Sequence, residues 1–139
     1  MLQACSPYLK KDIDVLEKVQ KRATKMIYGF SKLSYEERLI KCKITTLEKR
    51  GVRSDLIEVF KILNNFDKVD HRKFFTLSNS SRTMGHRFKL VKCRARLDIK
   101  KFFFANRVVD YWNKLPGHVV EATSVNMFKN RLDKFETYM

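Results

Sequence analysis

Apolar residues recur at intervals of three and four positions in four long stretches of this 139-residue chain. This interval places side chains on one face of an α-helix, whereas a half-buried strand would show an alternation of two. The chain also has only four Gly and two Pro, the residues that most disfavour helix interiors. The sequence therefore predicts a mainly α fold, a bundle of about five helices.

The first predicted helix follows Ser6 and Pro7, a capping hydroxyl and a proline at the first helical position. It continues to about Tyr28, where Gly29 can adopt the left-handed conformation of a helix cap. Its apolar positions form one stripe, which we expect to be buried: Ile13, Leu16, Val19, Ala23, Met26 and Ile27.

Two capping-box patterns predict the next two helix starts. Residues 34–37 open a short helix to about Cys42, with Leu39 and Ile40 as its buried face. Residues 45–48 open a long helix that ends before an Asn-Asn pair. The predicted buried stripe of the long helix is Val52, Leu56, Val59, Phe60 and Leu63.

Two more helices are predicted near the end of the chain. The first begins after Asp98 and stops at residues 116–117, a Pro-Gly pair. The second is capped by residues 123–124, a Thr-Ser pair. The predicted buried positions are Phe104, Val108, Tyr111, Trp112 and Leu115 in the first helix, and Val125, Phe128, Leu132 and Phe135 in the second.

Between these helical regions, residues 66–97 lose the helical interval. Residues 77–83 are small and polar, which is typical of a surface loop. Phe88 and Leu90 alternate with basic residues, which predicts a short strand or hairpin. The middle of the chain is therefore expected to be an irregular basic loop with at most a short hairpin.

At this length one domain, 1–139, is expected, with helical lobes at about 6–65 and 98–139 joined by the basic segment 66–97. No apolar run reaches the ~18 residues of a membrane span, and the first residues do not resemble a signal peptide. An odd number of widely spaced cysteines, three, favours reduced thiols. We therefore expect an intracellular protein of the nucleus or cytoplasm with no membrane partner.

Thirty Lys and Arg against fifteen Asp and Glu give a formal net charge of +15. Solubility alone requires a net charge of only about 2 to 8 in a small domain, so a polyanionic partner is expected. Residues 71–97 contain eight basic residues and no acidic one. The predicted phosphate ligands are Arg82, Arg87, Lys89, Lys92, Arg94, Arg96, Lys100 and Lys101, with Lys18, Lys21, Arg22 and Lys25 of the first helix.

Aromatic residues beside this positive charge could stack on nucleic-acid bases. Phe88, Phe102 and Phe103 are the candidates. Core packing is the alternative for the Phe102–Phe104 triple, because aromatic side chains are usually buried. Trp112 lies on a predicted apolar stripe and is expected in the core.

The sequence shows no arrangement typical of an active site. Asp12 and Asp14 are two positions apart on a predicted helix, which turns their carboxylates about 200° apart and prevents them from sharing a metal ion. No short-spaced pair of Cys or His ligands occurs. His86 and Cys93 are interpreted as a basic-patch histidine and a half-buried thiol. We expect no enzyme activity, no metal and no cofactor.

Seven segments resemble, in order, the C-terminal segment of the endonuclease and reverse transcriptase polyproteins of non-LTR (LINE, jockey-like) retroelements. They are spread along most of the length of the chain: Ser6–Asp12, Leu16–Ala23, Leu33–Leu39, Thr46–Arg50, Asp55–Lys61, Trp112–Pro116 and Ser124–Lys129. The resemblance implies a helical thumb and post-thumb region that contacts template and primer. The paired catalytic aspartates of the polymerase palm have no counterpart here, so the chain is expected to be a nucleic-acid-binding fragment without polymerase activity.

A different class of function stays open at this point. An apolar surface that would pack on the absent palm could instead bind a protein, the remainder of a reverse transcriptase or a second copy of the chain. A retroelement remnant without a function of its own is a further alternative. Preference for RNA or DNA depends on placed side chains and does not follow from the sequence.

Overall fold

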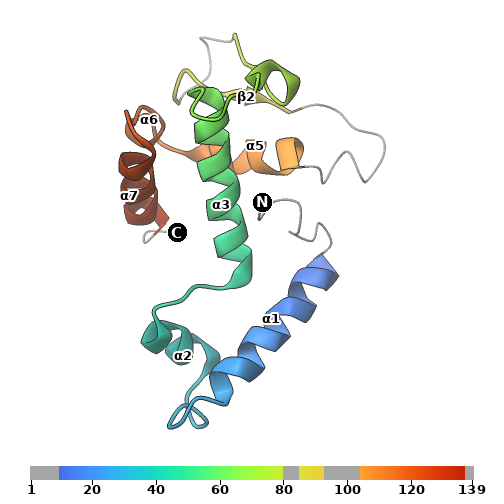
Figure 1. Ribbon diagram of the computed structural model, residues 1–139, viewed down its shortest axis with the longest axis vertical. Coiled ribbons are helices and arrows are strands. Elements are labelled where there is room, and N and C mark those ends of the chain that lie inside the picture. The colour runs from blue at the N-terminus through green and yellow to red at the C-terminus, as the bar shows by residue number, and fades with distance from the viewer. Residues whose placement is uncertain (1–9, 80–84, 93–103, 137–139) are drawn as a thin grey trace. The chain divides into compact units, whose positions relative to one another are not determined.

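The computed structural model describes residues 10–79, 85–92 and 104–136 (Figure 1). These residues form a mainly α-helical structure with six α-helices and one two-stranded antiparallel sheet, which confirms the predicted fold class. The chain divides into two compact units, Met1–Arg53 and Ser54–Met139. The boundary falls within helix α3 (Leu47–Leu63), and the described part of the basic segment belongs to the second unit.

In the first unit, α1 (Lys10–Lys25) packs on α2 (Tyr35–Cys42). The predicted capping box of α2 is present: the Glu37 amide donates to Ser34 Oγ at 3.2 Å, and the Ser34 amide donates to Glu37 Oε2 at 2.8 Å. The bond from the Ser34 backbone stabilises the carboxylate and lowers the pKa of Glu37. Local sequence thus determines where α2 begins.

The predicted buried face of α2 is half wrong. Leu39 is buried, but Ile40 is 75% exposed. The buried neighbour is instead Arg38, whose guanidinium lies 5.7 Å from the centre of the Tyr35 ring. A long side chain with an apolar stem can fill this place, because its methylene groups pack while its charge rests on an aromatic face.

The apolar stripe predicted to be the buried face of α1 is also wrong. Val19 is 61% exposed and Met26 is 86% exposed. The face that packs within the unit carries Glu17, Gln20 and Thr24, of which Thr24 is buried. Polar contacts along the helix therefore decide which of its faces is covered.

These polar contacts join segments that lie far apart in the sequence. Gln20 Nε2 donates to Tyr35 Oη at 2.9 Å and contacts the Thr45 carbonyl oxygen at 3.2 Å. Tyr35 Oη donates to Glu17 Oε1, and Glu17 Oε2 accepts from the Leu47 amide at 2.9 Å. Glu17 thus supplies an acceptor to a free amide at the start of α3.

The helix ends also differ from the prediction. Helix α1 ends at Lys25, before the expected end at Tyr28. Gly29 does have the expected positive φ of 81°, in the turn that follows. At the start of α3, the cap lies one residue later than the predicted box of residues 45–48: the Lys49 amide donates to Thr46 Oγ1 at 3.3 Å.

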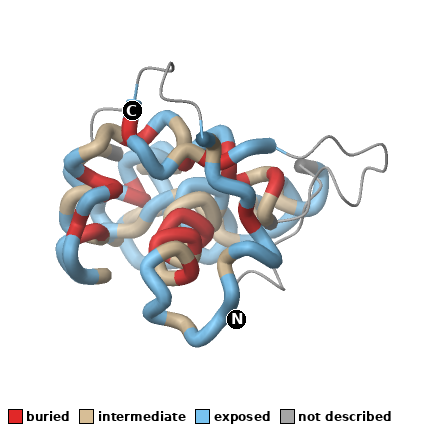
Figure 2. Tube along the Cα trace, turned by 90° about the horizontal axis from the view of Figure 1, so that it is seen from above, coloured by how far each residue is buried: buried red, intermediate tan, exposed pale blue. Residues whose placement is uncertain are grey.

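In the second unit, three aromatic rings form the centre of the core. Phe60 of α3 stacks on Phe128 of α7 (Val125–Glu136), with ring centres 4.3 Å apart and planes inclined by 12°. Trp112 of α5 (Phe104–Lys114) lies 6.0 Å from the Phe128 ring. All three side chains are fully buried, and Figure 2 shows that buried positions lie mainly on helices while the connecting turns are mostly exposed.

The Pro-Gly pair predicted to stop α5 also begins the short helix α6 (Gly117–Val120). Pro116 precedes its first residue, and the chain buries Val119 and Val120 there. Tyr111, predicted to be buried on α5, is exposed instead. The predicted cap of α7 is present, since the Met127 amide donates to Ser124 Oγ at 3.2 Å.

The predicted hairpin is present and very short. Strands β1 (Thr76–Leu77) and β2 (Leu90–Val91) pair antiparallel, with Leu77 opposite Leu90. A one-turn 3-10 helix, η1 (His71–Lys73), precedes β1. A two-residue ladder supplies little stability of its own, so the hairpin needs contacts from elsewhere.

Helix α5 supplies those contacts through two adjacent side chains. Trp112 Nε1 donates to the Phe88 carbonyl oxygen at 2.8 Å. Asn113 Nδ2 donates to the Leu90 carbonyl oxygen, and Asn113 Oδ1 accepts from the Leu90 amide, both at 2.9 Å. Trp112 and Asn113 therefore hold β2 and the residues that lead into it.

His86 is buried beside the same helix. Its Nε2 lies 3.1 Å from the Trp112 carbonyl oxygen, which can only accept, so Nε2 carries the hydrogen. Nδ1 is buried and has no hydrogen-bond partner within the described part of the chain. Burial lowers the pKa of His86, the Trp112 carbonyl opposes this shift, and nearby Lys89 adds to it.

This environment predicts an acid-sensitive second unit. The folded state holds the His86 proton less tightly than the unfolded state, so the free energy of unfolding should decrease as pH falls below about 6.5. Replacing His86→Gln keeps a donor for the Trp112 carbonyl oxygen and should remove this part of the pH dependence. Urea midpoints between about pH 8 and pH 5 measure the pH dependence of stability, and His118→Gln, at an exposed histidine, is the control. The prediction fails if H86Q keeps the wild-type slope.

Candidate nucleic-acid interface

Seven of the predicted nucleic-acid contacts lie outside the described residues. They are Arg82, Arg94, Arg96, Lys100, Lys101, Phe102 and Phe103. The remaining ones form two groups in different units. The first group lies on α1, and the second flanks β2 on both sides: Arg87, Phe88, Lys89 and Lys92.

The first group forms a continuous strip, here called the basic strip: Lys18, Lys21, Arg22 and Lys25. The intervals of three, four and seven positions place these side chains on one side of α1. All four are exposed. The strip covers about 11 Å along the helix axis, which is about the length of three phosphate intervals on one DNA strand.

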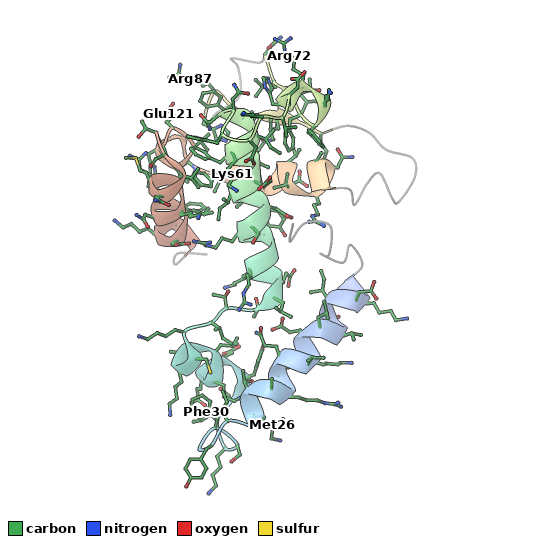
Figure 3. The ribbon with its side chains drawn as sticks, viewed as in Figure 1. Met26, Phe30, Lys61, Arg72, Arg87 and Glu121 are labelled. Atoms are coloured by element: carbon green, nitrogen blue, oxygen red, sulfur yellow. The ribbon has the colours of Figure 1, made fainter. Side chains whose placement is uncertain are left out.

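The charges of the basic strip are not neutralised within its unit. In the described ranges, no carboxylate oxygen lies within ion-pair distance of Lys18, Arg22 or Lys25. Figure 3 shows long side chains that project from α1 on the side away from α2. The strip is therefore free to bind an anion without first breaking an ion pair.

Lys21 has a further neighbour in Tyr35. Its Nζ lies 5.0 Å from the centre of the Tyr35 ring, within the range of a cation-π contact. Burial of the Tyr35 hydroxyl, together with its hydrogen bond to Glu17, raises the pKa of Tyr35. The phenol thus stays neutral at physiological pH, and the ring holds one end of the strip against its unit.

The second group is partly neutralised. Arg87 is 78% exposed, but its Nε lies 3.7 Å from Glu121 Oε1, and Figure 3 shows the two side chains beside each other. Lys92 forms an ion pair with Asp110. Lys89 is half-buried. Exposed ion pairs contribute only about 0 to 1 kcal/mol to stability, so a phosphate could replace the carboxylates as partners of Arg87 and Lys92. Breaking these ion pairs would reduce the net binding energy of the phosphate.

Phe88 is the described candidate for base stacking. Its ring is at the border between half-buried and exposed, and the Arg87 guanidinium lies 5.9 Å from the ring centre. The bond from Trp112 to the Phe88 carbonyl fixes its backbone. A hollow next to this ring has a volume of about 10 Å³, room for about one water molecule. Its size does not accommodate a base.

Sequence reasoning missed the acidic partners of the second group. Glu121 follows Arg87 by 34 positions and Asp110 follows Lys92 by 18, so no local pattern reveals either pair. It also left out of the site Arg72 and Lys73, two exposed cations on η1. Their membership of the basic run was the available signal.

Other kinds of site find no support in the described ranges. No group of three or more His, Cys, Asp or Glu side chains there could hold a metal ion. No helix among the described residues is both long and apolar enough to cross a membrane. Cys42 is a half-buried free thiol, and the other two cysteines lie outside the described residues.

No protein-family model, curated protein or solved structure matches the chain. The resemblance to retroelement reverse transcriptases therefore stands on the seven sequence segments alone.

Proposed function

We propose that the chain binds single-stranded or hybrid nucleic acid with little sequence preference. The observation that carries the proposal is the basic strip of α1, four exposed cations on one helix side without an acidic partner in the described ranges. Lys and Arg contacts to phosphates give affinity and carry no sequence information. An excess of fifteen positive charges over the whole chain supports the same partner.

The family resemblance adds the biological setting of the proposal. A thumb and post-thumb region would contact the backbone of a template and primer held by a polymerase palm. The present chain would then contribute binding without catalysis. The Trp112 and Asn113 contacts to the β2 segment give one resembling segment a structural role that does not depend on that family.

The first test measures binding to labelled RNA, DNA and hybrid across a salt series. If about five phosphates are engaged, log K should fall with log salt at a slope of about −3.5 for single strands and −4.5 for duplexes. The variant K18Q/K21Q/K25Q removes three charges of the basic strip. We expect its affinity to drop and its slope for single strands to shrink by about 2, because each lost contact removes about 0.7.

The control variant K32Q/K49Q/K134Q removes the same charge from exposed positions outside the strip. Circular dichroism checks that both triple variants keep the wild-type helix content. Equal losses from both variants would show a diffuse effect of net charge and would contradict the assignment to α1. A flat salt response of the wild type would contradict nucleic-acid binding itself.

A further inference from the structure

The turn between α1 and α2 displays an aromatic ring that the rest of the first unit leaves uncovered. The Phe30 amide donates to the Ile27 carbonyl oxygen at 3.0 Å and closes a turn around Tyr28 and Gly29. Gly29 has a φ of 81°, which is typical of the third position of a type II turn, so Tyr28 occupies the second position at the corner. The side chain of Tyr28 is fully exposed there.

The other aromatic rings described in the first unit each have a cation over one face. Lys41 Nζ lies 5.6 Å from the centre of the Phe30 ring, which is labelled in Figure 3. Lys21 Nζ lies 5.0 Å from the centre of the Tyr35 ring. Tyr28 has no such contact among the described residues. Its ring therefore keeps both faces free for a flat partner.

The charge around this turn suits a polyanion. Residues 18–35 contain five Lys or Arg and no Asp or Glu. Four of the five form the basic strip, which ends at Lys25, and the fifth is the exposed Lys32. Tyr28 follows Lys25 by three positions, so their Cα atoms are at most about 11 Å apart. A strand whose phosphates contact the basic strip can therefore place a base at Tyr28.

The carboxylates that border this segment do not cancel its charge. Glu17 accepts from Tyr35 Oη and from the Leu47 amide. Glu37 belongs to the capping box of α2, and Glu36 is exposed in the first turn of that helix. Residues 10–53 carry thirteen Lys or Arg against six Asp or Glu, so the surroundings of the turn stay positive.

We propose that Tyr28 stacks on an unpaired base of the nucleic acid whose phosphates contact the basic strip, an inference that rests on the function proposed above. The bases of a duplex are paired and stacked on each other, so a single strand or a single-stranded end has to supply this base. An aromatic face accepts any base, which agrees with binding of little sequence preference. The inference narrows the ligand to nucleic acid with unpaired bases.

A membrane surface is another partner of basic segments that carry exposed aromatic residues. The order of the cations along α1, with a flat ring after the last one, favours a strand, in which each phosphate is followed by a base. A membrane would also take up the aliphatic side chain of Met26, which is 86% exposed and lies two positions before Tyr28. Stacking needs a flat ring and does not use Met26.

Binding of the full chain to a labelled strand of about 12 thymidines tests the proposal. Tyr28→Ala should weaken binding about 5- to 150-fold, the usual range for the loss of one stacked base. The slope of log K against log salt should stay unchanged, because the phenol ring contacts no phosphate through a charge. Tyr28→Trp should bind at least as tightly as wild type, whereas Tyr28→Leu, which is apolar but has no ring, should lose as much as Y28A.

Three controls separate stacking from other effects. Met26→Ala, and Tyr111→Ala at an exposed tyrosine of α5, should each leave the affinity within about twofold of wild type. A strand of the same length without bases removes the stacking partner, so wild type and Y28A should bind it equally. A duplex of the same length should also bind both proteins equally.

Two kinds of failure can be told apart. If Y28A binds the thymidine strand as tightly as wild type, the stacking inference is overturned, while a salt-dependent wild type still supports nucleic-acid binding. Equal losses from Y28A and M26A, or an equal loss on the strand without bases, also overturn stacking. So does a loss confined to vesicles of phosphatidylserine and phosphatidylcholine, which would assign the ring to a membrane. A wild type that binds no nucleic acid overturns both proposals.

Discussion

Replacing Phe128→Ala should lower the free energy of unfolding of the second unit by about 3 to 5 kcal/mol. Phe128 has no exposed surface. Its ring centre lies 4.3 Å from that of Phe60, on which it stacks, and 6.0 Å from that of Trp112. Alanine would remove the apolar surface that the ring buries and leave a cavity between two other rigid rings that cannot close it. The loss is a large part of the ~5 to 15 kcal/mol that stabilise a typical domain.

Urea unfolding followed by tryptophan fluorescence measures this loss. Trp112 is the single tryptophan of the chain and lies in the same core, so its signal reports on the second unit. Asn126→Ala, an exposed change on α7, is the control and should shift stability by less than about 0.5 kcal/mol. If F128A shifts the urea midpoint no more than N126A does, the aromatic contacts do not form the core.

The second large effect concerns an ion pair in the interior of the second unit. Arg107 Nε and Nη2 donate to the two carboxylate oxygens of Asp55 at 2.8 and 3.0 Å. The Asp55 side chain is 8% exposed and the Arg107 side chain 21% exposed. Replacing Arg107→Met should destabilise the unit by about 3 kcal/mol, because it leaves a buried carboxylate without a partner.

The double variant D55L/R107M should recover most of that loss, because a pair of apolar side chains avoids the desolvation of two charges. Burial raises the pKa of Asp55, although the hydrogen bonds from Arg107 oppose this shift. When the pKa of a carboxyl is higher in the folded state, the free energy of unfolding decreases as pH rises from about 3.8 to the folded pKa. Urea midpoints of the wild type and both variants at neutral pH measure how much of the lost stability the double variant recovers. A double variant no more stable than R107M would contradict it.

The starts of α2 and α7 were predictable from the sequence, because a cap involves residues within one turn. Ser34 and Glu37 illustrate this, and the predicted box appears in the structure with both bonds. Helical spacing also predicted several buried side chains of α5 and α7 correctly, among them Trp112, Leu115, Phe128 and Leu132. It was wrong for Tyr111, which is exposed, and the predicted Val125 and Phe135 are only half-buried.

The covered face of α1 was not predictable in this way. Helical spacing shows which residues share a face, but it does not show which face meets the rest of the chain. That choice depends on Glu17 and Gln20, whose partners Tyr35, Thr45 and Leu47 lie 15 to 30 positions away. The candidate interface was not fully predictable for the same reason. Glu121 forms an ion pair with Arg87, and the two residues lie 34 positions apart in the sequence.

Asn113 has a consequence for how the small sheet ends. Its amide group presents to Leu90 the same donor and acceptor that a peptide unit of a third strand would present. Leu90 N–H and C=O point away from β1, so without Asn113 they would form an open edge at which a strand of another molecule could add. A single side chain thus acts as the last strand of the sheet, and it protects a two-residue hairpin from edge-to-edge aggregation.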